Sequence, residues 1–138
     1  MQNSKPILLI EDDDVDAITT RRALKEINVT NQLVHRINGE EGLKYLQDDE
    51  PQPCVILLDL NMPRMNGFEF LQIVKTNEDL KKIPVVVLTT SDTDQNIVDS
   101  YKLGVAGYIT KPVDYKQFVE SMRTVNMYWT LSRLPNSC

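Results

Sequence analysis

The chain has 138 residues, a formal net charge of −5 and a pI of about 4.8. That length suits one domain, and 41% hydrophobic with 25% charged residues is ordinary for a globular protein, which argues against disorder. An acidic chain repels phosphate backbones and anionic lipids, so we expect it to bind neither nucleic acid nor membranes.

Five short apolar runs are spaced along the chain as strands would be. The N-terminus leads into only this first brief apolar run, which meets acids at once and is too short for a signal peptide, so we expect a cytoplasmic protein. The first, third and fourth runs are apolar on both faces, which is typical of parallel strands covered on both sides. The second contains the polar His35 and Arg36 and is predicted at a sheet edge. In chain order the runs are 7–10, 33–37, 54–58, 85–88 and 107–109.

Helical patterns occupy the segments between these runs, and the last of them, from Tyr115 to Trp129, has the clearest apolar stripe. Five strands alternating with five helices predict a doubly wound α/β domain with right-handed crossovers. We predict one domain over residues 1–138, in which 126–138 extend the last helix and form a tail. A weak apolar set at Ile97, Val98 and Tyr101 predicts the fourth helix. The expected helix caps are Asp13 or Asp14, Asn38, Asn66, Asp92 and Asp114.

Polar residues suited to chemistry stand at the ends of four runs. Glu11 and Asp12 follow the first run, Asp59 the third, Thr89 the fourth and Lys111 the fifth. In open α/β sheets, ligands bind outside the carboxyl ends of the strands, so these side chains are expected to converge on one crevice. Three converging carboxylates repel one another unless a cation joins them, and oxygen ligands with few protein donors suit Mg²⁺. A carboxylate beside such a metal can attack phosphorus, while a lysine and a hydroxyl stabilise the transferring group.

Other phosphate chemistry has less support in the sequence. The chain has no glycine-rich phosphate loop, so a nucleotide is not the obvious phosphate donor. His35, the one histidine, belongs to the second run and is expected to lie away from the crevice. We therefore interpret it as a structural or surface residue and not as a phosphodonor.

Four motifs in this order and spacing resemble the receiver domain of two-component response regulators. They are Ile10 to Asp13, Leu58 to Pro63 with Gly67, Leu88 to Ser91, and Gly107 to Pro112. The resemblance implies a flavodoxin-like five-stranded sheet of order 2-1-3-4-5, with phosphotransfer from a sensor histidine kinase or a histidine phosphotransfer protein. Such a protein signals through protein contacts, and it is not an enzyme beyond catalysing its own phosphorylation and dephosphorylation.

The resemblance also implies the roles of the residues that would bind metal and phosphate. Asp59 matches the phosphoacceptor, and Asp12 matches the direct metal ligand. Glu11 matches the acid that usually binds metal through water, although Asp is commoner there. Asn61 matches the position whose main-chain carbonyl binds the metal. Lys111 matches the phosphate-binding lysine.

Two further positions match the residues that change conformation in this family. Thr89 matches the switch hydroxyl and Tyr108 the switch aromatic. The face made by the fourth helix, fifth strand and fifth helix is then expected to contact a kinase, a target or a second copy of the chain. The stretch 80–91 and the tail around Tyr128 and Trp129 resemble the small regulators partnered with phytochrome-type histidine kinases.

Two other classes of protein are alternatives. A phosphatase or mutase of the haloacid-dehalogenase class also uses Asp, Thr, Lys and Mg²⁺ on a parallel sheet. That class has a second carboxylate two residues after its nucleophile, where this chain has Asn61. The other alternative is a binding module that acts without phosphorylation, and failure to bind Mg²⁺ would favour it.

Overall fold

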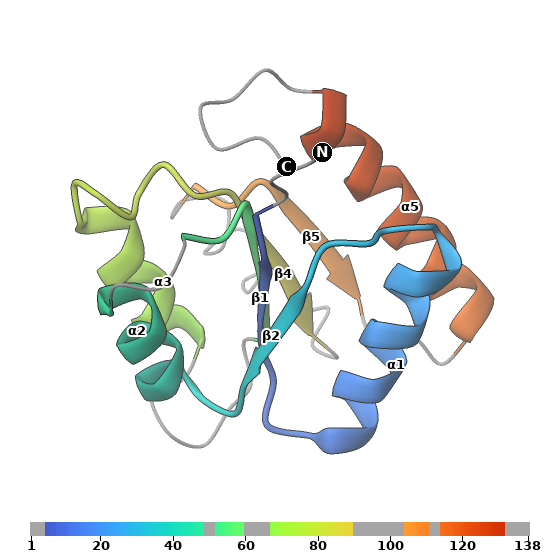
Figure 1. Cartoon of the computed structure of the whole chain (residues 1–138), viewed down its shortest axis with the longest axis horizontal. Coiled ribbons are helices and arrows are strands. Elements are labelled where there is room, and N and C mark those ends of the chain that lie inside the picture. The colour runs from blue at the N-terminus through green and yellow to red at the C-terminus, as the bar shows by residue number, and fades with distance from the viewer. Residues whose placement is uncertain (1–4, 49–51, 60–66, 90–103, 111–113, 132–138) are drawn as a thin grey trace.

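A computed structural model of the chain describes residues 5–48, 52–59, 67–89, 104–110 and 114–131. Its five strands form one parallel sheet in the order β2-β1-β3-β4-β5 (Figure 1). This order and the edge position of β2 confirm the predicted topology. The strands are β1 (Ile7–Ile10), β2 (Leu33–Arg36), β3 (Val55–Asp59), β4 (Val85–Thr89) and β5 (Gly107–Thr110).

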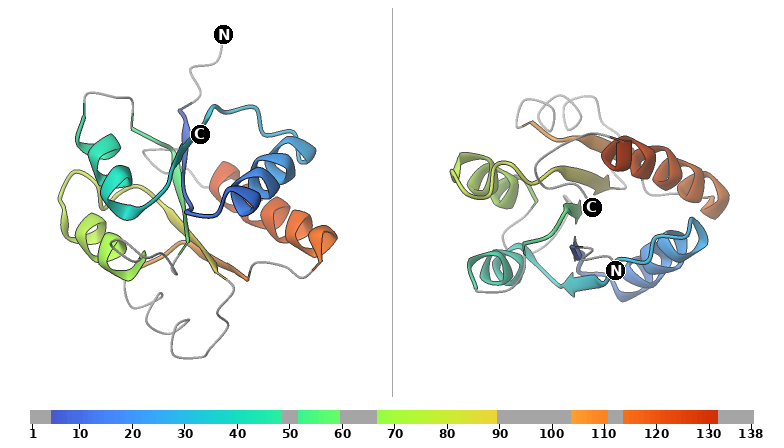
Figure 2. Two further views of the ribbon diagram at one scale, coloured as in Figure 1. Left: turned by 90° about the horizontal axis from the view of Figure 1, so that it is seen from below. Right: turned by 45° about the horizontal axis from the view of Figure 1, so that its top comes forward.

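Helices cover both faces of the sheet. Figure 2 shows α2 and α3 on one side and α1 and α5 on the other. The predicted fourth helix falls outside the described residues. Within the described ranges α5 continues past residue 126, and the predicted tail falls outside them. The helices are α1 (Asp14–Glu26), α2 (Gly39–Gln47), α3 (Gly67–Thr76) and α5 (Tyr115–Leu131).

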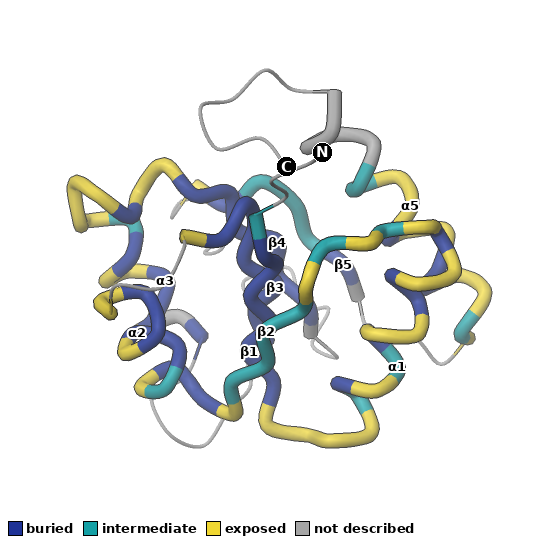
Figure 3. Tube along the Cα trace, in the orientation of Figure 1, coloured by how far each residue is buried: buried dark blue, intermediate teal, exposed yellow. Residues whose placement is uncertain are grey.

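Two apolar layers hold the sheet between the helices. Every residue of β1 and β3 is buried, as the continuous apolar runs predict, and the outer faces of the helices are exposed (Figure 3). Ile10 and Phe70 belong to the layer beneath α2 and α3. Gly42 of α2 packs directly against both side chains, so this helix lies close to the end of β1.

Local hydrogen bonds fix where two helices begin and where one ends. The Asp13 side chain accepts from the Asp16 amide at 3.0 Å, and Asn38 Oδ1 accepts from the Glu41 amide at 2.9 Å, so both predicted caps are confirmed. At the end of α1, Asn28 adopts φ 66°, a left-handed conformation that asparagine tolerates better than most residues. The Val29 amide then donates to the Leu24 carbonyl at 2.9 Å, which closes the helix.

The register of the sheet brings the strand ends to one edge. Ile10 lies beside Leu58, and Thr89 lies beside Thr110, so the segments that follow these strands leave the sheet at the same side. No described helix combines the length and the apolar character that crossing a bilayer requires.

Candidate functional site

Three carboxylates converge at the carboxyl edge of the sheet. Glu11 and Asp12 follow β1, and Asp59 is the last residue of the neighbouring β3. One carboxylate oxygen of each residue lies within 4.8 Å of the others. Glu11 is 0% exposed and Asp59 is 4% exposed, whereas Asp12 is exposed. The convergence predicted from the sequence is therefore found for these three acids, and solvent reaches the cluster on the side of Asp12.

The donor set of this cluster fits a hard divalent cation. Carboxylate oxygens from three residues are the ligands that Mg²⁺ and Ca²⁺ prefer, and Mg²⁺ in particular binds with one or two carboxylates and several waters. Three negative charges at this separation also repel one another, and a bound cation removes that repulsion. Glu11, Asp12 and Asp59 are thus suited to hold such an ion.

The loop that contains Glu11 and Asp12 is held by the end of β2. The Glu11 amide donates to the Arg36 carbonyl at 3.0 Å, which extends the β1–β2 pairing by one residue. The Glu11 carbonyl lies 2.7 Å from His35 Nε2. Glu11 Oε2 in turn accepts from the Asp13 amide at 3.2 Å. The main chain on both sides of Glu11, and its own carboxylate, are therefore fixed.

His35 is not a member of the acidic cluster, but its ring contacts the main chain of Glu11. Its position on an edge strand suggested distance, but β2 pairs directly with β1, and His35 lies beside Leu9 in the register. The imidazole is long enough to reach from β2 to the loop two residues beyond Leu9. The signal available in the sequence was a polar ring near the end of a strand that the implied order 2-1-3-4-5 places beside the first strand.

Arg36, the last residue of β2, makes two contacts of its own. Its guanidinium carbon lies 5.2 Å from the centre of the Tyr45 ring on α2, within range of a cation–π interaction. Its Nη1 atom donates to the His35 carbonyl at 2.9 Å. These contacts hold the end of the strand from which the His35 ring reaches Glu11.

The remaining predicted site residues are placed only in part. Thr89 ends β4, on the strand next to the one that ends in Asp59. Tyr108 of β5 lies beside Val87 and packs, half-buried, against the apolar layer that includes Val87. Asn61 and Lys111 lie outside the described residues.

Helix α1 meets α5 close to the start of α5. The Tyr115 hydroxyl donates to Glu26 Oε1 at 3.0 Å, and the guanidinium carbon of Arg22 lies 4.5 Å from the centre of the Tyr115 ring. Burial raises the pKa of Tyr115 above its usual 10.0, and the hydrogen bond and negative charge of Glu26 raise it further, against the opposing charge of Arg22. This contact ties α5 to α1.

A second polar contact lies at the amino end of β4, on the side of the sheet opposite the acidic cluster. Lys75 of α3 donates from Nζ to the Ile83 carbonyl at 3.1 Å and to the Lys81 carbonyl at 3.3 Å, both in the segment that leads into β4. Partial burial lowers the pKa of Lys75 from its usual 10.5. The residue belongs to the scaffold, because it connects the end of α3 to the segment before β4.

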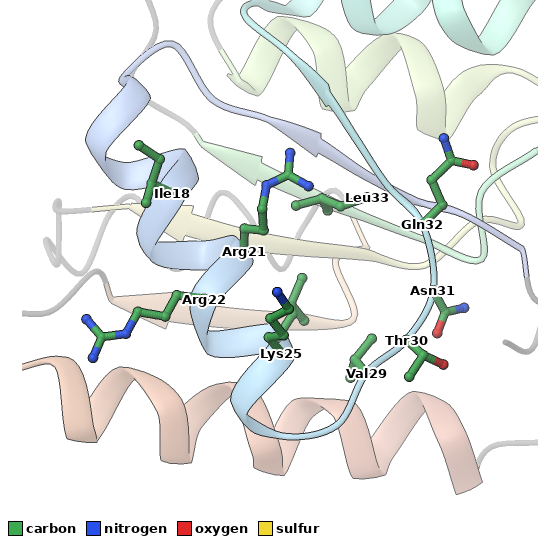
Figure 4. Close-up of a pocket in the computed structure, with 10 residues that line it drawn as sticks. Ile18, Arg21, Arg22, Lys25, Val29, Thr30, Asn31, Gln32 and Leu33 are labelled. Carbon is green, nitrogen blue, oxygen red and sulfur yellow. The ribbon is translucent and has the colours of Figure 1, made fainter.

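A groove of about 870 Å³ lies between α1 and the segment that leads into β2. Figure 4 shows the basic residues Arg21, Arg22 and Lys25 on the helix and the polar Asn31 and Gln32 across from it. None of the predicted site residues lines it. The groove is therefore a feature separate from the acidic cluster.

The sheet order and the acidic cluster at its carboxyl edge define a response-regulator receiver. The family model "Response regulator receiver domain" matches residues 7–123, and the chain belongs to this family. It is thus a receiver of two-component signalling, a class that works with histidine kinases.

Comparison with individual proteins shows which kind of receiver this chain resembles. The chain is 37% identical over 130 residues to Response regulator Rcp1 of Synechocystis, an alignment that covers 91% of this chain and 88% of that protein. The crystal structure of the phosphorylated cyanobacterial phytochrome response regulator RcpA has a TM-score of 0.88 at 36% identity, covering 96% and 99% of the two chains. The Mn²⁺-bound form of Rcp1 has a TM-score of 0.85 at 36% identity, covering 95% and 99%. The resemblance to receivers, and to phytochrome-associated regulators among them, is confirmed.

Proposed function

We propose that this receiver accepts a phosphoryl group on Asp59 in a Mg²⁺-dependent reaction in the cytoplasm. The observation that supports the proposal is the convergence of Glu11, Asp12 and Asp59 at the carboxyl ends of β1 and β3. Asp59 is the member of this cluster that stands on β3, the central strand of the sheet. It is the last residue of that strand and is buried. The proposed phosphodonor is a phosphohistidine of a sensor kinase or a histidine phosphotransfer protein.

The acidic cluster and three further residues have distinct parts in the proposed reaction. Mg²⁺, held by the three carboxylates and the main-chain carbonyl of Asn61, would neutralise negative charge as the phosphoryl group arrives. A carboxylate oxygen of Asp59 attacks phosphorus, the P–N bond of the phosphohistidine breaks, and the released imidazole takes up a proton. Lys111 neutralises further charge on the phosphoryl oxygens, and the Thr89 hydroxyl hydrogen-bonds one of them.

Dephosphorylation is proposed to use the same residues. Water attacks phosphorus, and the O–P bond to Asp59 breaks, which regenerates the carboxylate and releases inorganic phosphate. The chain is therefore proposed to catalyse only its own phosphorylation and dephosphorylation. Turnover of small phosphate esters would instead favour a phosphatase.

The acceptor is tested with acetyl phosphate and Mg²⁺, followed by intact mass measurement. Wild type should gain one phosphoryl group that is stable in acid and labile in base, and a chelator should abolish the gain. Asp59→Asn should remain unlabelled. Asp79→Asn, at an exposed site on the opposite edge of the sheet, is the matched control and should be labelled like wild type. Equal labelling of Asp59→Asn would refute the assignment.

We further propose that phosphorylation acts through Thr89 and Tyr108 on the surface formed by the fourth helix, β5 and α5. The two residues lie on neighbouring strands, and Tyr108 is beside Val87, two residues before Thr89. The Tyr108 ring is only half-buried, so a shift inward is compatible with its position. A phosphoryl group that favours one arrangement changes partner affinity by a coupling on the order of 1–3 kcal/mol.

The proposed partners on this surface are a phytochrome-type histidine kinase, a target protein or a second copy of the chain. Thr89→Ala should still accept phosphate but lose most of the coupling, because the hydroxyl that senses the phosphoryl group is gone. Sedimentation and kinase-binding measurements, with and without phosphorylation, test this. A Thr89→Ala variant that responds like wild type would exclude the switch while leaving Asp59 as the acceptor.

A further inference from the structure

The loop after β1 must bend for its two acids to reach the same place. Successive side chains of an extended strand point to opposite faces of the sheet. Glu11 and Asp12 are successive residues, yet a carboxylate oxygen of each lies within 4.8 Å of Asp59. The chain accordingly leaves β1 at Ile10 and bends at Asp12. The peptide between Glu11 and Asp12 therefore determines whether both carboxylates face the cluster.

His35 holds this peptide from outside the cluster. The carbonyl oxygen of Glu11 is part of the peptide, and His35 Nε2 lies 2.7 Å away. A carbonyl oxygen can only accept a hydrogen bond, so Nε2 carries the proton and donates it. The amide on the other side of Glu11 donates to the Arg36 carbonyl at 3.0 Å. Two consecutive residues of β2, His35 and Arg36, thus hydrogen-bond the carbonyl and the amide of Glu11.

From this geometry we infer that His35 is a positioning residue for the cation site, which rests on the proposed Mg²⁺-dependent function. Its ring fixes the Glu11–Asp12 peptide plane, so that the buried Glu11 and the exposed Asp12 bind one ion together. Loss of a hydrogen bond that orients metal ligands typically lowers metal affinity 10–100-fold.

The test is calorimetric titration with Mg²⁺ alone of wild type and three variants. His35→Leu removes the donor and should raise the Mg²⁺ Kd about tenfold or more. His35→Gln retains a donor at a similar distance from the main chain and should recover most of the affinity. Leu33→Ala is the matched control, because Leu33 stands two residues earlier on β2 and packs, half-buried, in the α1/α5 layer. It should lower the urea midpoint without changing the Kd.

A nitrogen NMR signal reports on the peptide directly. The Asp12 amide nitrogen belongs to the same peptide as the Glu11 carbonyl, so its resonance should move in His35→Leu, less in His35→Gln, and little in Leu33→Ala. A wild-type chain that binds no Mg²⁺ would refute the proposed function. A wild-type chain that binds Mg²⁺, together with a His35→Leu variant of equal affinity, would refute the role of His35 and leave the function intact. Failure of His35→Gln to recover affinity, with the Asp12 signal unmoved, would also refute it.

Discussion

Replacing Gly42 by alanine tests the close approach of α2 to β1. An added Cβ would overlap Ile10 Cδ1 and would lie 3.1 Å from Ile10 Cγ1 and 3.2 Å from Phe70 Cε1. Both neighbours are fully buried, so neither side chain can move out into solvent. Either the helix must shift away from the sheet, or the Ile10 side chain must change its conformation within the core.

The expected magnitude is a balance of two effects of opposite sign. Overpacking a core by one methyl group costs about 1–3 kcal/mol. Alanine is a better helix former than glycine by about 1 kcal/mol. We therefore expect Gly42→Ala to lower the free energy of unfolding by about 1 kcal/mol, although helix propensity alone predicts a gain. In the wild-type background Ile10→Val, which removes Cδ1, should cost about 0.5–1.5 kcal/mol.

Urea denaturation of wild type, both single variants and the double variant measures the coupling. Because Ile10→Val removes the atom that the new Cβ overlaps, the two substitutions together should cost less than their sum, by about 1 kcal/mol. The slopes of the transitions must be equal for the comparison to hold. A Gly42→Ala chain more stable than wild type, or a double variant whose cost equals the sum, would show that the contact with Ile10 does not limit this position.

Three other changes have defined outcomes. Asp12→Ala should weaken Mg²⁺ binding in calorimetric titration more than Glu11→Ala, because a direct ligand contributes more than one acting through water; the reverse order would exchange their roles. Burial lowers the pKa of Lys75, so between that lowered value and 10.5 the folded chain binds fewer protons than the unfolded chain. The stability of wild type relative to Lys75→Met in urea should therefore rise with pH across that window, and parallel profiles would contradict this. Burial, with the hydrogen bond and charge of Glu26, raises the pKa of Tyr115. The contribution of Tyr115 to stability is therefore complete below pH 10.0 and is lost as pH rises through the raised pKa. Phenolate absorbance should show Glu26→Gln moving that titration toward 10.0, and an unchanged curve would rule out the effect of Glu26.

The sheet could be predicted from the sequence because its strands are unusually apolar. The residues of 7–10 and 85–88 are apolar without interruption, and a parallel sheet covered on both faces is the structure that buries such runs. The order of the strands came from the resemblance to receivers rather than from the runs themselves. The sequence also indicated the acidic cluster, since carboxyl ends of parallel strands meet at one edge.

Two features that the sequence did not indicate depend on how closely separate elements approach one another. The role of His35 follows from the register of β2 against β1 and from the reach of an imidazole, and neither can be read from a single strand. The contact of Gly42 with Ile10 likewise depends on how closely α2 approaches the sheet. The parts of the predicted site at Asn61 and Lys111 stay predictions, because they lie outside the described residues.

The contact of Arg36 with the neighbouring carbonyl has a consequence for the edge of the sheet. An open strand edge is a template on which another chain can add a strand and start aggregation. The carbonyls of Gln32 and Arg36 accept from the amides of Ile7 on β1 and of Glu11 just beyond it, at 2.8 and 3.0 Å. Because carbonyls alternate in direction along a strand, that of His35 points toward the open edge. There Arg36 Nη1 donates to it at 2.9 Å, so one acceptor that an incoming strand would use is already hydrogen-bonded, and strand addition at this four-residue edge is disfavoured.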